Sequence, residues 1–357
     1  IAVIGAGAVG AGTAWHLSRH GHEVTLFDPR LSEACDRTSK PNGLNGTTAS
    51  LGVLMGNVFR RSSGRGWRLR RSSMTQWPSW IETLRPFAPE LRVRSPLLQL
   101  AEDSSAAERQ RQLVEQRPDL GLELVKAEHC PLPCAGGLQS AGDGWINPLV
   151  LQKALRQAIH QGPIQQKDVK VCRLRRERVK AGSLWRVESS DGDSSLHAAV
   201  VICSALDSAA LLEPLGHERP MSAVLGQVLA LELDESPPSW TTWPAVLVHK
   251  GFNLIPTGAH TLLLGATLEP GEQADPTHLS AMQHLLSAGP EWLKRAKVSG
   301  SWYGLRARPV ERAAPLLETL EPGLLLATGH YRNGVLLTPA TAEWIKDQLD
   351  DLIETNF

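Results

Sequence analysis

The opening 28 residues constrain the fold more than any other part of the chain. An apolar strand is predicted over residues 1–4, followed by the run Gly5-Ala6-Gly7-Ala8-Val9-Gly10, a helix to about residue 20 and a second strand over 23–28. In a G-x-G-x-x-G run, the first glycine makes a tight turn and the second lets the backbone approach a pyrophosphate. The third lets the helix pack on the strand, with the helix N-terminus facing the phosphates. These glycines are Gly5, Gly7 and Gly10. The order strand, glycines, helix, strand predicts a dinucleotide-binding unit.

A carboxylate completes this pattern. Asp28 ends the second strand, 18 residues after Gly10, where it can accept hydrogen bonds from the hydroxyls of an adenosine ribose. The pattern by itself does not separate NAD from FAD.

Composition excludes several classes of protein. The 357 residues hold 37 Lys+Arg against 37 Asp+Glu, and the sequence pI near 7.3 argues against a nucleic-acid-binding protein. We expect two domains at this length. No apolar stretch is long enough for a membrane span, and the N-terminal run does not have the pattern of a secretory signal. Five cysteines form no disulfide framework, so we expect reduced thiols and a cytoplasmic location.

Periodicity predicts further elements along the chain. Helical spacing is expected over 72–86, 148–159 and 277–288, and a closing helix from about Leu337. Strands are predicted near 169–174, 184–188, 198–203 and 324–328, with three β-rich segments between 224 and 268 and a proline- and glycine-rich boundary at 131–148. Sequence typical of nucleotide binding near both ends, with β-rich sequence between, implies that the first domain is discontinuous.

The C-terminal text carries a family resemblance. Residues 325–342 read LLATGHYRNGVLLTPATA, a strand, a glycine-containing turn and a helix start. Together with the glycine run, Gly144-Trp145-Ile146-Asn147-Pro148, Leu264-Gly265-Ala266-Thr267 and Gly304-Leu305-Arg306, this text resembles the D-amino-acid oxidase superfamily of flavoproteins. It is most similar to the glycine oxidase branch, whose members in thiamine biosynthesis end in very similar text. The resemblance covers nearly the whole chain.

That resemblance implies a combined α/β and α+β fold. A discontinuous Rossmann-type FAD-binding domain would comprise 1–75, 141–215 and 300–357, and a β-rich substrate domain would comprise 76–140 and 216–299. It implies FAD as cofactor, and because neither Cys nor His occurs in the 47–56 loop and no Cys follows Cys203, we expect FAD to be noncovalent. The residues implied in cofactor binding are Gly5, Gly7, Gly10, Asp28, Pro29, Arg30, Thr48, Ala49, Ser50, Gly52, Val171, Ser204, Gly329, His330, Tyr331, Arg332, Asn333, Gly334, Val335 and Leu336.

The implied chemistry is oxidation of a C–N bond. The α-hydrogen would pass as hydride to flavin N5, oxygen or another acceptor would reoxidise the flavin, with H2O2 formed from O2, and the imine would hydrolyse to a ketoacid or aldehyde and ammonia. A guanidinium grips a substrate carboxylate bidentately, which makes Arg306 the first candidate anchor and Arg332 the second. Tyr331 and Asn253 complete the predicted catalytic set. Asn253 stands where glycine oxidases usually carry a tyrosine, and Arg308 adds a positive charge.

Three alternatives remain open for function. They are a glycine-oxidase-type enzyme, a sarcosine oxidase or D-amino-acid dehydrogenase with another electron acceptor, and a flavoprotein whose pocket has diverged from oxidase chemistry. The pair His16 and His20 has metal-friendly spacing but no third ligand, so no metal is expected. A small-molecule substrate is expected, and a homo-oligomer is possible in solution.

Overall fold

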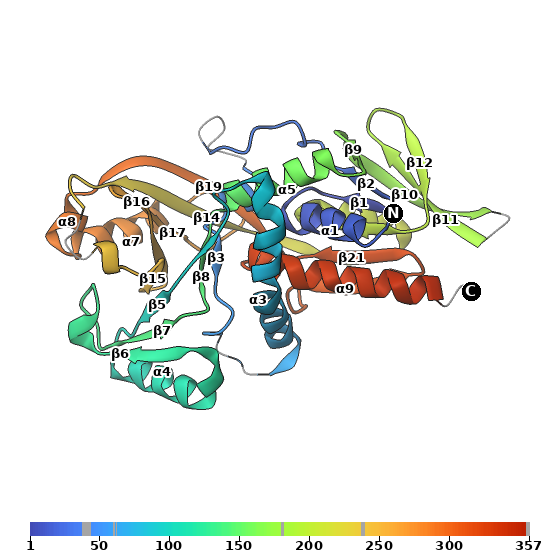
Figure 1. Cartoon of the computed structure of the whole chain (residues 1–357). Coiled ribbons are helices and arrows are strands. Elements are labelled where there is room, and N and C mark those ends of the chain that lie inside the picture. The colour runs from blue at the N-terminus through green and yellow to red at the C-terminus, as the bar shows by residue number, and fades with distance from the viewer. Residues whose placement is uncertain (38–43, 60, 62, 180–181, 237–239, 355–357) are drawn as a thin grey trace.

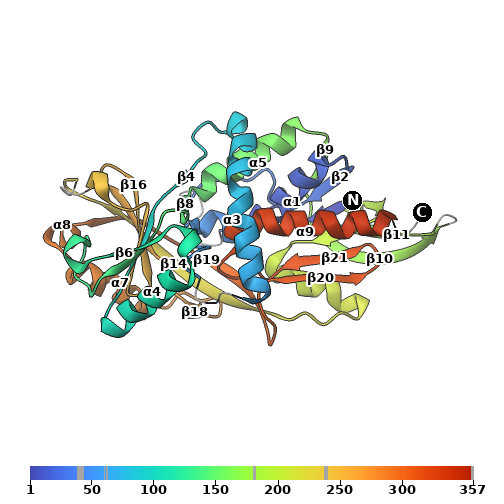
Figure 2. The same cartoon turned by 60° about the horizontal axis from the view of Figure 1, so that its bottom comes forward.

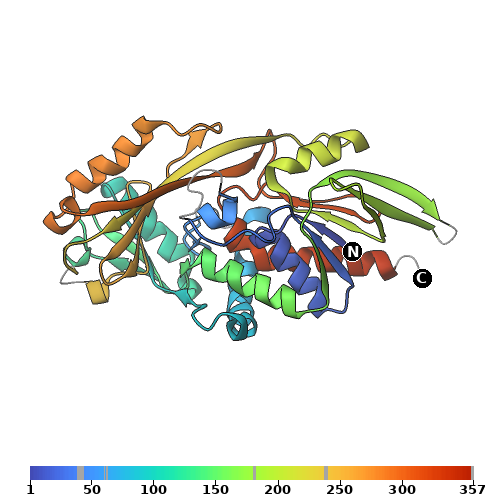
Figure 3. The same ribbon diagram turned by 90° about the horizontal axis from the view of Figure 1, so that it is seen from above.

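Two long antiparallel strands, β14 (Met221–Glu232) and β19 (Lys297–Pro309), run side by side from one lobe of the molecule to the other (Figure 3). The computed structural model describes residues 1–37, 44–59, 61, 63–179, 182–236 and 240–354. Both chain ends lie in the lobe drawn on the right of Figure 1.

The lobe that contains the chain ends is built on a six-stranded sheet in the order β20-β21-β13-β1-β2-β9. All neighbours pair in parallel except β20 with β21. Its strands are β1 (Ala2–Ile4), β2 (Val24–Phe27), β9 (Ile164–Lys167), β13 (Val200–Ile202), β20 (Leu316–Glu321) and β21 (Leu324–Thr328). The predicted first strand, helix and second strand are confirmed, with the helix as α1 (Ala8–Arg19).

Different layers cover the two faces of this sheet. Val3 and Val201 face a core formed with the helices, whereas the alternate residues Ala2 and Ile4 face the three-stranded sheet β10-β11-β12. The helices are α1, α3 (Gly64–Leu84), α5 (Pro148–Gln161) and α9 (Gly334–Glu354); the strands are β10 (Val171–Val179), β11 (Gly182–Ser189) and β12 (Ser194–His197). Figure 2 shows α3 crossing in front of the junction between the lobes.

The other lobe holds a nine-stranded sheet in the order β18-β14-β17-β16-β15-β5-β7-β6, with β19 paired to β14. The remaining strands are β5 (Leu97–Leu100), β6 (Leu122–Val125), β7 (Gly137–Ser140), β15 (Val246–His249), β16 (Phe252–Gly258), β17 (Thr261–Gly265) and β18 (Glu269–Pro270). One face packs on α7 (Pro276–Ser287) and α8 (Glu291–Lys294); α4 (Ser104–Gln116) lies beside β6. Between the lobes, β3 (Val53–Leu54), β8 (Gly144–Ile146) and β4 (Val93–Arg94) form a small sheet, next to the short helix α2 (Gly46–Ala49).

Several predicted boundaries are wrong. The helix expected over 72–86 begins at Gly64, because most of the arginine-rich segment before it is helical, and the closing helix begins at Gly334 instead of 337. The 131–148 stretch contains β7 and β8, so it is not only a linker. Four strands, not three, lie within 221–265.

The proposed domain division remains a proposal. Its limits at 75/76 and 299/300 fall within α3 and β19, whereas the limit at 215/216 falls between elements. In the described part of the chain, no helix combines the length and apolar character that crossing a bilayer requires.

Candidate active site

The glycine turn after β1 is closely packed, and each glycine has a steric reason. Gly5 has φ of +100°, and a Cβ there would lie 2.8 Å from the carbonyl oxygen of Cys203. A Cβ at Gly10 would overlap the Gly5 carbonyl, so helix and turn could not approach as they do. At Gly7, the nearest atom to a Cβ would be Thr47 Oγ1, at 3.3 Å.

Asp28 holds this turn from the end of β2. Its Oδ2 accepts a hydrogen bond from the Ala6 amide at 2.6 Å, and its Oδ1 accepts one from the Arg30 amide at 2.8 Å. A carboxylate oxygen has more than one acceptor site, so these bonds orient Asp28 and leave it able to accept a further hydroxyl. Pro29, between them, is exposed.

Most of the predicted cofactor residues gather at one edge of the six-stranded sheet. The strands β21, β13, β1 and β2 are parallel neighbours, so the residues after their carboxyl ends share that edge. Following these strands are the glycine turn, Asp28, Ser204 and the Gly329–Leu336 segment. Ser204 Oγ lies 3.2 Å from Ser208 Oγ. Val171 lies apart from this edge: it is buried at the start of β10, in the core between the three-stranded and the six-stranded sheet.

The segment around α2 contacts both this edge and the nine-stranded sheet. Thr47 Oγ1 accepts from the Ala8 amide at the start of α1, at 2.9 Å. On the other side, a Cβ at Gly304 of β19 would overlap Ala49, so glycine is needed for the close approach. The Thr48 hydroxyl donates to Gln152 at 2.8 Å and so faces α5. Gly52, at φ +78°, has no room for a Cβ beside the Ile146 carbonyl.

Arg306 lies on β19, two residues beyond Gly304 and on the same face. Its Nη1 donates to the carbonyl oxygens of Leu225 and Thr267, at 3.0 and 3.1 Å. The guanidinium lies across Gly226 of β14, where a Cβ would overlap it. Burial, and then the charge of Arg332, lower the pKa of Arg306 to about 10, so it stays protonated at neutral pH. The two predicted anchors therefore lie in one electrostatic environment.

A buried carboxylate lies behind Arg306. Glu269 is 1 % exposed; it accepts from the Thr267 hydroxyl, from Gln227 Nε2 at 2.9 Å and from the Asp275 amide at 2.8 Å. This network fixes Thr267, whose carbonyl binds Arg306. The sequence analysis did not single out Gly226 or Glu269 as site residues.

The turn before α9 brings Tyr331 beside β19. Tyr331 has φ of +57°, and its amide donates to Ala307 O at 3.2 Å. The Arg308 guanidinium lies 5.7 Å from the centre of its ring. Arg332 is exposed, whereas His330 is buried and bonded to Thr341 Oγ1 at 2.9 Å. The His330 side chain is therefore part of the core.

The remaining members of the turn lead into the helix. The Asn333 amide donates to His330 O at 3.0 Å, and Gly334 begins α9. Val335 and Leu336 are buried in its first turn.

Asn253 shares a face of the nine-stranded sheet with Arg306. Cross-strand register aligns Asn253 with Gly265, Gly265 with Val228 and Val228 with Trp302, four residues before Arg306. The Asn253 Nδ2 donates to Gly265 O at 3.1 Å. Its short side chain is therefore engaged within the sheet.

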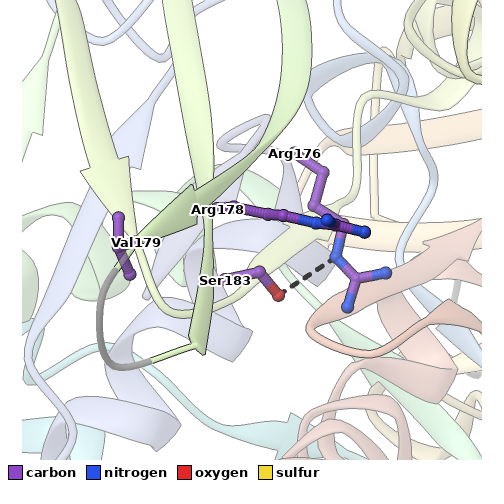
Figure 4. A pocket seen from close by; sticks show the side chains of 4 residues that line it. All are labelled: Arg176, Arg178, Val179 and Ser183. Carbon is purple, nitrogen blue, oxygen red and sulfur yellow. Dashed lines mark hydrogen bonds between the residues drawn. The ribbon is translucent and has the colours of Figure 1, made fainter.

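The surface has two hollows near or beyond the predicted site. One, at the β10–β11 hairpin, is lined by Arg176, Arg178, Val179 and Ser183, and Figure 4 shows Arg176 donating to Ser183. It contains no predicted site residue. The other is lined by residues of β14, the β18 region, Arg308 and Tyr331.

The histidine pair on α1 has a structural role. His16 binds Glu343 of α9 at 3.0 Å and stacks on Trp80, and burial lowers its pKa to about 4. Among the described residues, no group of three His, Cys, Asp or Glu side chains is placed to hold a metal ion.

Two observations fit a bound dinucleotide. The glycine turn presents backbone at the N-terminus of α1, and Ser50 Oγ, in the connecting segment, is buried without a hydrogen-bond partner among the described residues. Native proteins rarely leave a buried hydroxyl unsatisfied, so this oxygen is a candidate ligand contact.

Comparison with known proteins identifies a family, similar sequences and solved structures with the same fold. Residues 1–348 match the family described as "FAD dependent oxidoreductase". The glycine oxidase of Bacillus licheniformis is 25% identical, with 97% of this chain and 92% of that protein covered. The crystal structure of glycine oxidase from Geobacillus kaustophilus superposes with a TM-score of 0.82 at 23% identity, covering 98% and 94% of the two chains. That of L-proline dehydrogenase from P. horikoshii gives 0.80 at 18%, covering 98% and 92%.

Proposed function

The chain belongs to the family of FAD-dependent oxidoreductases, and from that premise we propose that it oxidises the C–N bond of a small amino acid or amine, as a glycine oxidase does. The similarity to the glycine oxidase of Bacillus licheniformis over nearly the whole length of both proteins supports this substrate class.

The observation that carries the proposal is the placement of Arg306. Its guanidinium is held by two backbone carbonyls, and Gly304, two residues earlier on the same strand, packs against Ala49 of α2. Only Nη1 is used in these bonds, so Nη2 and Nε retain donors for a carboxylate.

The residues that would hold FAD are those at the shared strand edge. The N-terminus of α1 would bind the pyrophosphate, Asp28 the ribose, and the segments 48–52 and 329–336 the flavin. Bound FAD supplies an acceptor for the hydride of the substrate α-carbon, and O2 or another acceptor takes up the electrons. We expect noncovalent binding.

The chain's own residues have a restricted task. Arg306 binds and orients the carboxylate, and Arg332 adds positive charge to the same region. A protein base is unnecessary if the amine enters neutral, since loss of hydride then yields a protonated imine directly. Water hydrolyses the imine to a ketoacid or aldehyde and ammonia.

A second candidate keeps the cofactor but changes substrate or acceptor. The side chain of Asn253 is an amide that donates to Gly265 O. It therefore does not supply the hydroxyl that a tyrosine would. This favours weighing a sarcosine oxidase or D-amino-acid dehydrogenase type of reaction beside glycine oxidation. A flavoprotein with a diverged pocket is the further alternative, which the ordered Arg306 opposes.

Anaerobic bleaching of the flavin absorbance tests the proposal. The purified protein is mixed with glycine, sarcosine, D-amino acids and simple amines, and then with O2 and with artificial electron acceptors. Bleaching by an amine with H2O2 on reoxidation supports the oxidase, and bleaching reversed only by another acceptor supports a dehydrogenase. A flavin that no amine bleaches excludes both. We also propose a cytoplasmic location, in keeping with five free cysteines.

A further inference from the structure

Arg37 holds the backbone of the segment between the two lobes. Its Nε donates to Thr48 O at 2.8 Å and its Nη2 donates to Ser50 O at 2.7 Å. The rigid fork of a guanidinium can bind two carbonyls in one fixed geometry. Arg37 lies in the loop after β2, about ten residues before the backbone that it binds.

The carbonyl between these two and the carbonyl that follows them are held in the same way by indoles. Trp302 Nε1 donates to Ala49 O at 3.0 Å, and Trp145 Nε1 donates to Leu51 O at 2.7 Å. Four successive carbonyls, from residue 48 to residue 51, therefore accept side-chain hydrogen bonds. We call these four groups with their three donor side chains the carbonyl clamp.

Arg37 is the charged member of the carbonyl clamp. Its guanidinium stacks on the Trp302 ring, 4.3 Å from the centre, and burial lowers its pKa to about 10. In the described chain, no carboxylate pairs with it within ion-pair distance. Partly burying a cation without a counter-ion costs free energy, so stability of the fold alone gives no reason for an arginine at this position.

The position of the clamp suggests that reason. The clamped segment follows Thr47, which binds the first turn of α1. It includes Ser50, whose hydroxyl has no hydrogen-bond partner in the part of the chain that the structure describes. With four carbonyls turned to the clamp, the conformation of this segment is set before a ligand binds. Pre-organisation of this kind increases affinity because ordering is not required at binding.

We propose that Arg37 is a positioning residue for FAD, fixing residues 48–51 in the conformation that receives the flavin. The inference rests on the proposed contact of this segment with FAD. It does not depend on which amine is oxidised.

Removing the fork should weaken FAD binding more than it weakens the fold. We would prepare apoprotein of the wild type, Arg37→Met and Arg37→Lys and measure the FAD dissociation constant by flavin fluorescence, together with the thermal midpoint of each apoprotein. Loss of two charge-assisted hydrogen bonds predicts a dissociation constant at least about tenfold higher for Arg37→Met. Lysine can bind one carbonyl, so Arg37→Lys should lie between the two. The visible circular dichroism of bound flavin should also change in Arg37→Met.

Arg117 provides a matched control. It too donates to a backbone carbonyl, that of Asn57, and lies 4.4 Å from the centre of an indole ring, that of Trp67, but it contacts no predicted cofactor segment. Arg117→Met should lower the apoprotein midpoint and leave the FAD dissociation constant within about twofold of wild type.

Three results would contradict the positioning role of Arg37 or the proposed substrate class. An unchanged dissociation constant in Arg37→Met, or an equal change in Arg117→Met, overturns the positioning role. If Arg37→Met does not fold, Arg37→Lys decides: unaltered affinity and flavin dichroism would contradict the proposal. A wild-type protein that binds FAD but is bleached by no amine refutes the proposed substrate class and leaves the Arg37 test intact.

Discussion

The guanidinium of Arg306 lies over the backbone of Gly226, in the space that any larger residue would occupy with its Cβ. Val224, two residues before Gly226 on β14, is the cross-strand partner of Arg306. The side chain thus crosses its neighbouring strand obliquely to reach the carbonyls of Leu225 and Thr267. Arg306 can take this position only because Gly226 has no side chain.

Gly226→Ala should therefore impair substrate binding without loss of FAD. Displacing Arg306 costs hydrogen bonds to a charged group, and we expect KM to rise by about tenfold or more. Steady-state kinetics and the flavin content of the purified variant check this. Gly300→Ala, where a Cβ meets nothing closer than 3.8 Å on the same strand pair, is the control. A normal KM in Gly226→Ala would mean that Arg306 can bind substrate from another position.

Arg306→Ala should raise KM by about a hundredfold, since a charge pair with the substrate carboxylate is lost. FAD should remain bound at wild-type stoichiometry. Arg308→Ala, which removes a nearby exposed guanidinium stacked on Tyr331, should have a much smaller effect. Loss of FAD from Arg306→Ala would instead assign that residue to the structure of the cofactor site.

Asp28→Asn should weaken FAD binding by about tenfold, because one of the two amide bonds and the ribose acceptor are impaired. Asp168→Asn is a matched control. Asp168 also accepts two amides in the loop after β2, those of Leu31 and Ser32, at 3.3 and 3.2 Å. Fluorescence titration of both apoproteins with FAD gives the comparison. Equal losses would indicate that loop order, and not the Asp28 carboxylate, sets affinity.

Acid should destabilise the fold through His330. Burial, followed by the charge of Arg65, lowers its pKa from 6.5 to about 3. Between these values the unfolded chain binds more protons than the folded one, so the free energy of unfolding falls as pH falls below 6.5. The contribution of this one group is about 2 kcal/mol at pH 5.

Denaturant unfolding from pH 7 to pH 4.5 measures that dependence. His330→Gln should show a shallower loss of stability than the wild type over this range, and His160→Gln, exposed on α5, should follow the wild type. Identical pH slopes in all three proteins would rule out His330 as the source.

Local patterns were enough for one part of the site. Gly5, Gly10 and Asp28 are near one another in sequence, in a single strand–helix–strand unit that the structure confirms. Their part in cofactor binding stays a prediction. The start of α3 was missed because its first turns are rich in arginine and glycine and have no clear apolar period. Two arginines of this helix bind the segment before it: Arg70 Nη1 donates to Met55 O, and Arg71 Nη1 donates to Asn57 Oδ1.

The sequence by itself determined the dinucleotide unit, the family and the identity of Arg306 as a candidate anchor, because those signals are carried by short contiguous motifs. Only the tertiary structure decided what holds that anchor and what holds the segment opposite it. Gly226 lies 80 residues before Arg306, and Arg37 and Trp302 are separated by most of the chain. Their contacts depend on the register of β14 with β19 and on the packing of the loop after β2 against β19. Such long-range juxtapositions leave no local pattern, since each residue alone is compatible with many other neighbours.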